Sequence, residues 1–126
     1  MKIAIPVVED MLAPRFGHCT SFAFFDVDAE KKEVLARQDM PAPPHRPDYF
    51  PNWLAECGIR LVIASGMGKR ALALLRQKQI AAIVGAEIGV PEHLVGAYLN
   101  GQVESGENLC DGCYTVKIKL PAKPQA

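Results

Sequence analysis

The residues with the clearest chemical potential lie in one short segment near the N-terminus. Residues 13–19 read Ala-Pro-Arg-Phe-Gly-His-Cys, so Arg15, His18 and Cys19 bring a guanidinium, an imidazole and a thiol within five positions. A guanidinium offers fixed hydrogen-bond donors to an anion, whereas imidazole and thiolate groups are ligands for iron, copper or zinc. The segment therefore predicts a binding loop, with His18 and Cys19 as candidate metal ligands. In the alternative interpretation, His18 caps a turn and Cys19 packs inward as a small hydrophobic residue.

A second segment combines glycines with the expected start of a helix, and its members are Ser65, Gly66, Met67 and Gly68. Backbone N–H groups at a helix N-terminus have no intrahelical acceptor, and their dipoles favour a negatively charged ligand. The segment contains neither GxxxxGK[ST] nor GxGxxG, so the pattern indicates a local anion site and no nucleotide motif. In the alternative interpretation the two glycines only permit a close turn, and Met67 only packs.

A third motif is Cys110-Asp111-Gly112-Cys113. Two cysteines at this spacing can share a metal ion or form a redox disulfide. There is no second CxxC to complete a zinc ribbon, and Tyr114 stands where c-type haem attachment needs a histidine. Three interpretations of Cys110 and Cys113 therefore stay open: metal or cluster ligands, a redox pair, or no function.

Charge and composition exclude several classes of function. Among 126 residues, 14 Lys and Arg balance 14 Asp and Glu, so no global field favours nucleic acid or an anionic membrane. No apolar stretch approaches the roughly 20 residues that span a bilayer, and the N-terminus lacks a secretory signal, so we expect a cytoplasmic protein with reduced thiols. Paired carboxylates, a Ser-His-Asp grouping and HExxH spacing are all absent from the sequence. We therefore expect a binding protein and no enzyme.

The elements that must position these residues follow from the apolar pattern. Nearly continuous or alternating apolar runs predict strands, and spaced apolar residues with Pro and Gly at the ends predict helices. Asp48 is expected to cap a helix that Gly58 ends. The predicted strands are 2–8, 21–27, 33–39, 60–64 and 80–84, with a further edge strand at 114–120, and the predicted helices are 49–57, 69–79 and 91–100.

This order predicts one α/β domain with a mixed sheet of about five strands and helices on both faces. Strands 2–8 and 60–64 should be parallel neighbours, with strand 80–84 beyond them. Ligands in such sheets bind outside the carboxyl ends of the strands. That rule predicts a crevice whose two walls are the long loop 9–20 and the turn 65–68.

The same residues resemble a known family. The segments MKIAIPV, APRFGH, FAFFDVD, ASGMGKRALALL and AYLNG occur in the order and spacing of the dinitrogenase iron-molybdenum cofactor biosynthesis family, over about residues 1–104. That family includes NifX-like proteins, the C-terminal part of NifB-like proteins and the molybdenum-copper orange protein. The resemblance implies a three-layer α/β/α fold of the ribonuclease H type, and a role in carrying, storing or scaffolding anionic metal-sulfur clusters.

The resemblance also bears on the site. The family's loop after the first strand matches Arg15, Phe16, Gly17 and His18, and its glycine turn matches Gly66 to Gly68. It implies an iron-sulfur, molybdenum-iron-sulfur or molybdenum-copper-sulfur ligand, and partners that assemble or accept clusters. We expect a monomer or weak homodimer. Residues 105–126 diverge from the family, so the role of Cys110 and Cys113 is not inherited from it. Two alternative functions of the protein stay open: a CxxC redox or metal-sensing module, or an interaction domain without ligand.

Overall fold

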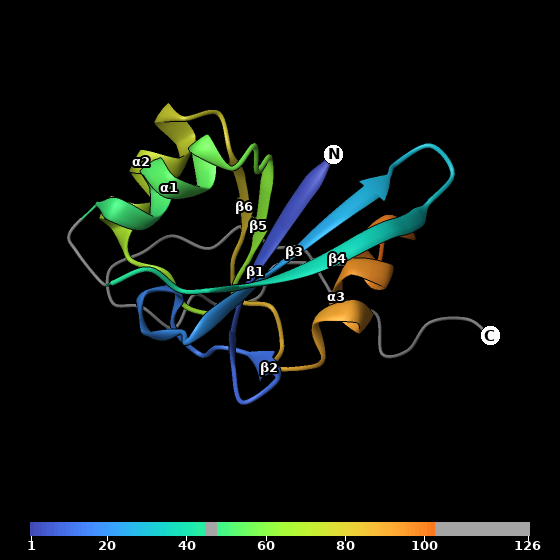
Figure 1. The fold of residues 1–126 in the computed structure, drawn as a ribbon, viewed down its shortest axis with the longest axis horizontal. Helices are drawn as coiled ribbons and strands as arrows, with labels where there is room; N and C mark the ends of the chain where they lie inside the picture. Colours follow the sequence, from blue (N-terminus) through green and yellow to red (C-terminus); the bar gives the residue numbers. More distant parts are fainter. Residues whose placement is uncertain (45–47, 103–126) are drawn as a thin grey trace.

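The fold is organised by one central strand, β1 (Lys2–Val8), whose inner residues are all buried. The computed structural model describes residues 1–44 and 48–102. β1 pairs antiparallel with β3 (Ser21–Asp28) and parallel with β5 (Leu61–Ile63), and the sheet runs in the order β4-β3-β1-β5-β6 (Figure 1). The other strands are β2 (Met11–Leu12), which pairs with the end of β1, β4 (Glu33–Pro41) and β6 (Ala81–Ile83).

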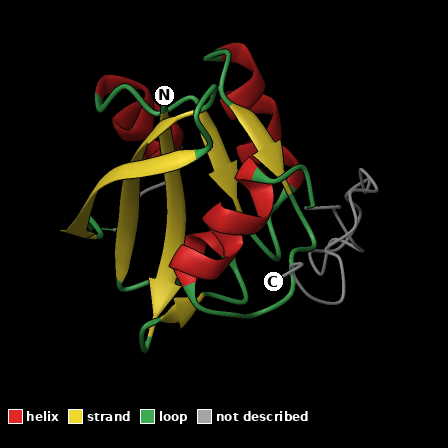
Figure 2. Cartoon of the chain, turned by 90° about the vertical axis from the view of Figure 1, so that its right-hand side faces the viewer, coloured by secondary structure: helices red, strands yellow, loops and turns green. Residues whose placement is uncertain are grey.

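Helices cover both faces of this sheet. α1 (Tyr49–Glu56) and α2 (Lys69–Gln77) lie together on one face, and α3 (Pro91–Leu99) lies on the other (Figures 1 and 2). None of the helices described in the structure combines the length and the apolar character that a bilayer crossing requires. The predicted three-layer α/β/α architecture with a mixed sheet is confirmed.

Strand alternation divides the core into two halves. Successive side chains of a strand point to opposite faces, so Ile3 and Ile5 of β1 pack toward α3, whereas Ala4 packs toward α1 and α2. β3 follows the same rule, with Phe25 on the α3 side and Phe22 on the other. A strand buried on both faces reads as a continuous apolar run, which is why the sequence of β1 predicted its central position.

Arg37 fastens the edge strand β4 to α3. Its guanidinium lies 5.4 Å from the centroid of the Phe25 ring. It also forms ion pairs with Glu92 of α3 and with Asp39, the latter at 2.9 Å. The predicted hairpin of β3 and β4 is confirmed, and it includes a register shift between Asp26 and Val27.

Two local expectations need correction. The stretch 9–20 is not an unstructured loop, because it contains β2 and a short 3-10 helix, η1 (Phe16–His18). Asp48 precedes α1 as predicted, but its side chain makes no capping hydrogen bond. Its carboxylate instead binds Arg70, which lies far along the chain. The predicted strand 114–120 lies outside the described residues.

Candidate functional site

The two predicted walls of the crevice are joined by backbone hydrogen bonds. Arg15 and Gly66 form an isolated parallel bridge. The N–H of Phe16 donates to the carbonyl oxygen of Gly66 at 2.8 Å, and the N–H of Gly66 donates to the carbonyl oxygen of Pro14 at 2.9 Å. The walls follow the carboxyl ends of the parallel strands β1 and β5, so the prediction that they lie together at one end of the sheet is confirmed.

The bridge changes which amides are available to a ligand. Because the N–H of Gly66 already donates to Pro14, it is not a free donor for an anion. The first N–H groups of a helix have no intrahelical acceptor, and α2 begins at Lys69 with no side-chain cap from Gly68. On this wall, the amides that could serve an anion are therefore those of Gly68 and the first turn of α2.

Gly68 has no structural need to be glycine. Its backbone has φ −72° and ψ 159°, which any residue adopts. A Cβ added to Gly68 would meet no atom within 4 Å. The interpretation that this glycine only permits a close turn therefore loses its physical basis. What the missing side chain does provide is open space over the start of α2.

Phe16 anchors the loop through its ring. The side chain is 4% exposed and makes edge-to-face contacts with Phe22 and Phe50, with ring centroids 5.9 and 5.7 Å apart. Met67 on the other wall is fully buried in the same half of the core. Phe16 and Met67 therefore hold the walls in place, and only their backbones border the site.

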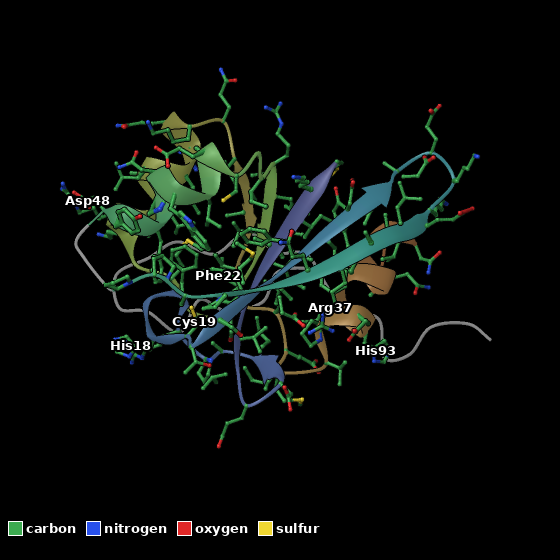
Figure 3. The ribbon with its side chains drawn as sticks, in the orientation of Figure 1. His18, Cys19, Phe22, Arg37, Asp48 and His93 are labelled. Atoms are coloured by element: carbon green, nitrogen blue, oxygen red, sulfur yellow. The ribbon has the colours of Figure 1, made fainter. Side chains whose placement is uncertain are left out.

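Arg15 and His18 are exposed, and His18 projects outward from the loop (Figure 3). Gly17, between them in the sequence, is half-buried in η1. Cys19 is half-buried and packs against the core half that contains Phe16. Burial raises the pKa of the Cys19 thiol from 9.0 to about 11. Cys19 in this structure is therefore a protonated, packed thiol, whereas Arg15 and His18 are accessible to a ligand.

Positive charge collects at the start of α2. Lys69 and Arg70 occupy its first two positions, beside Gly68. Arg70 forms a bidentate ion pair with Asp48, and hydrogen bonding to Arg70 lowers the pKa of the Asp48 carboxyl. Sequence reasoning missed this pair. The signal that could have found it is the presence of two cations in a first helical turn, where the helix dipole disfavours positive charge.

The described residues do not supply a ready-made coordination sphere for a single metal ion. Within residues 1–44 and 48–102, no group of three or more His, Cys, Asp and Glu side chains is arranged to hold a metal ion. His18 and Cys19 stay predictions as metal ligands. Cys110 and Cys113 lie outside the described residues.

The structure is a small three-layer α/β domain. Its exposed cations Arg15, Lys69 and Arg70 lie in the segments that follow the carboxyl ends of the parallel strands β1 and β5. Residues 1–101 match the family model described as dinitrogenase iron-molybdenum cofactor, and the chain belongs to that family.

Individual relatives share the fold at low sequence identity. The uncharacterized protein MJ0580 of Methanocaldococcus jannaschii is 23% identical over 110 residues, covering 85% of this chain and 92% of that protein. The crystal structure of PH0822 superposes with a TM-score of 0.75 at 23% identity, covering 88% of this chain and 96% of that one. The apo form of the orange protein from Desulfovibrio gigas has a TM-score of 0.64 at 20% identity, covering 99% and 96%. These likenesses establish the fold.

Proposed function

We propose that this protein binds, carries or scaffolds an anionic metal-sulfur cluster and catalyses no reaction with its own side chains. The observation that carries the proposal is the bridge between Arg15 and Gly66, which joins the loop that carries Arg15 to the turn that leads into α2. A cluster brings its own sulfide ligands, so the protein need not supply a complete set of metal ligands. The family description and the fold shared with the orange protein support this class of cargo.

The chemistry of binding follows from the groups at the edge. Sulfide ligands of a cluster accept hydrogen bonds, and Arg15 together with the amides from Gly68 onward donates them. Each charge-assisted hydrogen bond contributes roughly 1.5–3 kcal/mol, more than a neutral one. In this proposal the exposed imidazole of His18 contacts a metal atom of the cluster. The cargo is an iron-sulfur, molybdenum-iron-sulfur or molybdenum-copper-sulfur species in this proposal.

A carrier needs proteins that load and unload it, so the proposed partners are proteins that assemble or accept clusters. We propose a monomer or weak homodimer that acts in the cytoplasm. The alternative functions, a redox or metal-sensing module at Cys110 and Cys113 or an interaction domain without ligand, stay predictions.

Binding of a small thiometallate tests the proposal. Tetrathiomolybdate is an anion whose sulfide ligands present the proposed chemistry, and its visible absorption reports binding during an anaerobic titration. We expect the wild-type protein to bind it and Arg15→Ala to bind about tenfold more weakly or worse. The matched control is Arg60→Ala, because exposed Arg60 lies beside Lys2 at the amino ends of β5 and β1. Equal loss in both variants would contradict a site at Arg15.

A further inference from the structure

An ion pair between Asp48 and Arg70 joins α2, the helix that follows the glycine turn of the candidate site, to the residue before α1. Nε of Arg70 lies 2.5 Å from one carboxylate oxygen of Asp48, and an Nη lies 2.6 Å from the other. The Arg70 side chain is 77% exposed and that of Asp48 is 30% exposed. Arg70 therefore has room to turn toward another acceptor, whereas Asp48 is the more fixed partner.

The Asp48 carboxylate binds Arg70 of α2 and does not cap its own helix. Asp48 has φ 65°, in the left-handed region that non-glycine residues rarely adopt. It occupies the N-cap position of α1, where an aspartate side chain ordinarily accepts a hydrogen bond from the helix, yet it makes no such bond. Local structure therefore gains little from this carboxylate, and its contact is with α2.

Arg70 follows the proposed binding site closely in the chain. It is the second residue of α2, two positions after Gly68 and four after Gly66, which bridges to Arg15. The chain before Asp48 is also tied to the site loop, because the N–H of Ala42 donates to the carbonyl oxygen of Thr20 at 3.1 Å. Asp48 and the exposed His18 lie on the same side of the molecule in Figure 3.

We propose that Asp48 competes with the anionic cargo for the guanidinium of Arg70. In the ligand-free protein Arg70 is held by the Asp48 carboxylate, and on loading it exchanges that carboxylate for a sulfide ligand of the cluster. Asp48 thereby limits affinity, which suits a carrier that must release what it binds. This inference rests on the proposed function and adds Arg70 as a second cationic contact and Asp48 as its competitor.

The test compares two Asp→Asn variants in the same anaerobic titration with tetrathiomolybdate. Asp48→Asn removes the competing charge, and asparagine tolerates the left-handed backbone. Asp39→Asn is the matched control, because Asp39 is an exposed carboxylate that also pairs with an arginine, Arg37, and it lies on β4, outside both walls of the site. We expect Asp48→Asn to bind about fivefold more tightly than wild type and Asp39→Asn to change affinity by less than about twofold.

Two further variants establish that the effect passes through Arg70. Arg70→Gln should weaken binding severalfold, and the double variant Asp48→Asn with Arg70→Gln should match Arg70→Gln alone. Equal affinities of Asp48→Asn and Asp39→Asn, or a gain that survives loss of Arg70, would overturn the competition. If Arg15→Ala still weakens binding in that case, the proposed function stands without it. Absence of binding by the wild-type protein would overturn both.

Discussion

Neighbouring residues of the site loop, residues 9–20, differ sharply in burial. Arg15 and His18 are exposed, whereas Phe16 between them is buried in an aromatic cluster. The buried Phe16 ring restricts the backbone of the loop, and it therefore also restricts the position of Arg15. A loop held only by polar surface contacts would position the guanidinium less well. The predicted ligand chemistry of residues 13–19 therefore separates into exposed ligand groups and a buried anchor.

Adding one methyl group at Gly68 tests whether the open space there belongs to the binding site. Because a Cβ at this position meets nothing in the structure, Gly68→Ala should change the free energy of unfolding by about 1 kcal/mol or less. The same methyl would occupy the space over the start of α2, so we expect tetrathiomolybdate to bind about fivefold more weakly or worse. Gly96→Ala in α3 is the control, since its added Cβ also meets nothing. Unchanged binding by Gly68→Ala would remove this space from the site.

Cys19 gives a prediction about pH. Its thiol pKa is raised from 9.0 to about 11 by burial, so the folded protein holds the proton more tightly than the unfolded chain. The resulting stabilisation is present below about pH 9 and is lost as the pH rises toward about 11. We expect alkylation of Cys19 by iodoacetamide, followed by peptide mass spectrometry, to be slow at pH 8 and to accelerate toward pH 11. Rapid alkylation of Cys19 in the folded protein at pH 7 would contradict the packed thiol.

At the scale of elements, the site loop depends on its aromatic anchor. Phe16→Leu should lower the free energy of unfolding by roughly 0.5–3 kcal/mol and loosen the loop that carries Arg15. Phe24→Leu is the control, because Phe24 is 7% exposed in the same core half and contacts Phe22 and Trp53. Both variants should lose similar stability in thermal unfolding, but only Phe16→Leu should weaken tetrathiomolybdate binding. Equal binding losses would mean that Phe16 acts through global stability alone.

The elements show what local sequence could and could not predict. The strands were predictable within one or two residues, because their apolar runs reflect burial on one or both faces. β2 and η1 were not, since β2 forms through pairing with Val7 of β1 and η1 depends on the packing of Phe16 against residues distant in sequence. The prediction of a side-chain cap by Asp48 was wrong, because the carboxylate instead binds Arg70, a residue distant in sequence.

At the scale of the whole molecule, topology accounts for the site's location. The parallel pairing of β1 with β5 follows from the right-handed crossover rule, and it alone predicted that the two walls would meet. It did not predict that the N–H of Gly66 would donate to the carbonyl oxygen of Pro14, because that hydrogen bond depends on the path of the loop backbone. In the proposed site, the amide donors are therefore those from Gly68 onward and not that of Gly66.

The cysteines of residues 105–126 give a prediction about where the cluster is held. If the cargo lies at the edge formed by Arg15 and α2, replacing Cys110 and Cys113 together by serine should leave tetrathiomolybdate affinity within about twofold of wild type. Arg15→Ala should be the damaging change in the same titration. Full binding without Arg15 and complete loss without the two cysteines would move the metal site to the CDGC motif.

The native protein offers the most direct measurement of the central claim. Purified anaerobically from cells supplied with iron, molybdenum and copper, it should carry acid-labile sulfide together with stoichiometric metal, and show charge-transfer bands in the visible spectrum. The same analysis on Arg15→Ala should give much less of both metal and sulfide. A colourless wild-type protein with neither, from cells grown under the same conditions, would contradict the assignment of a metal-sulfur cluster as its cargo.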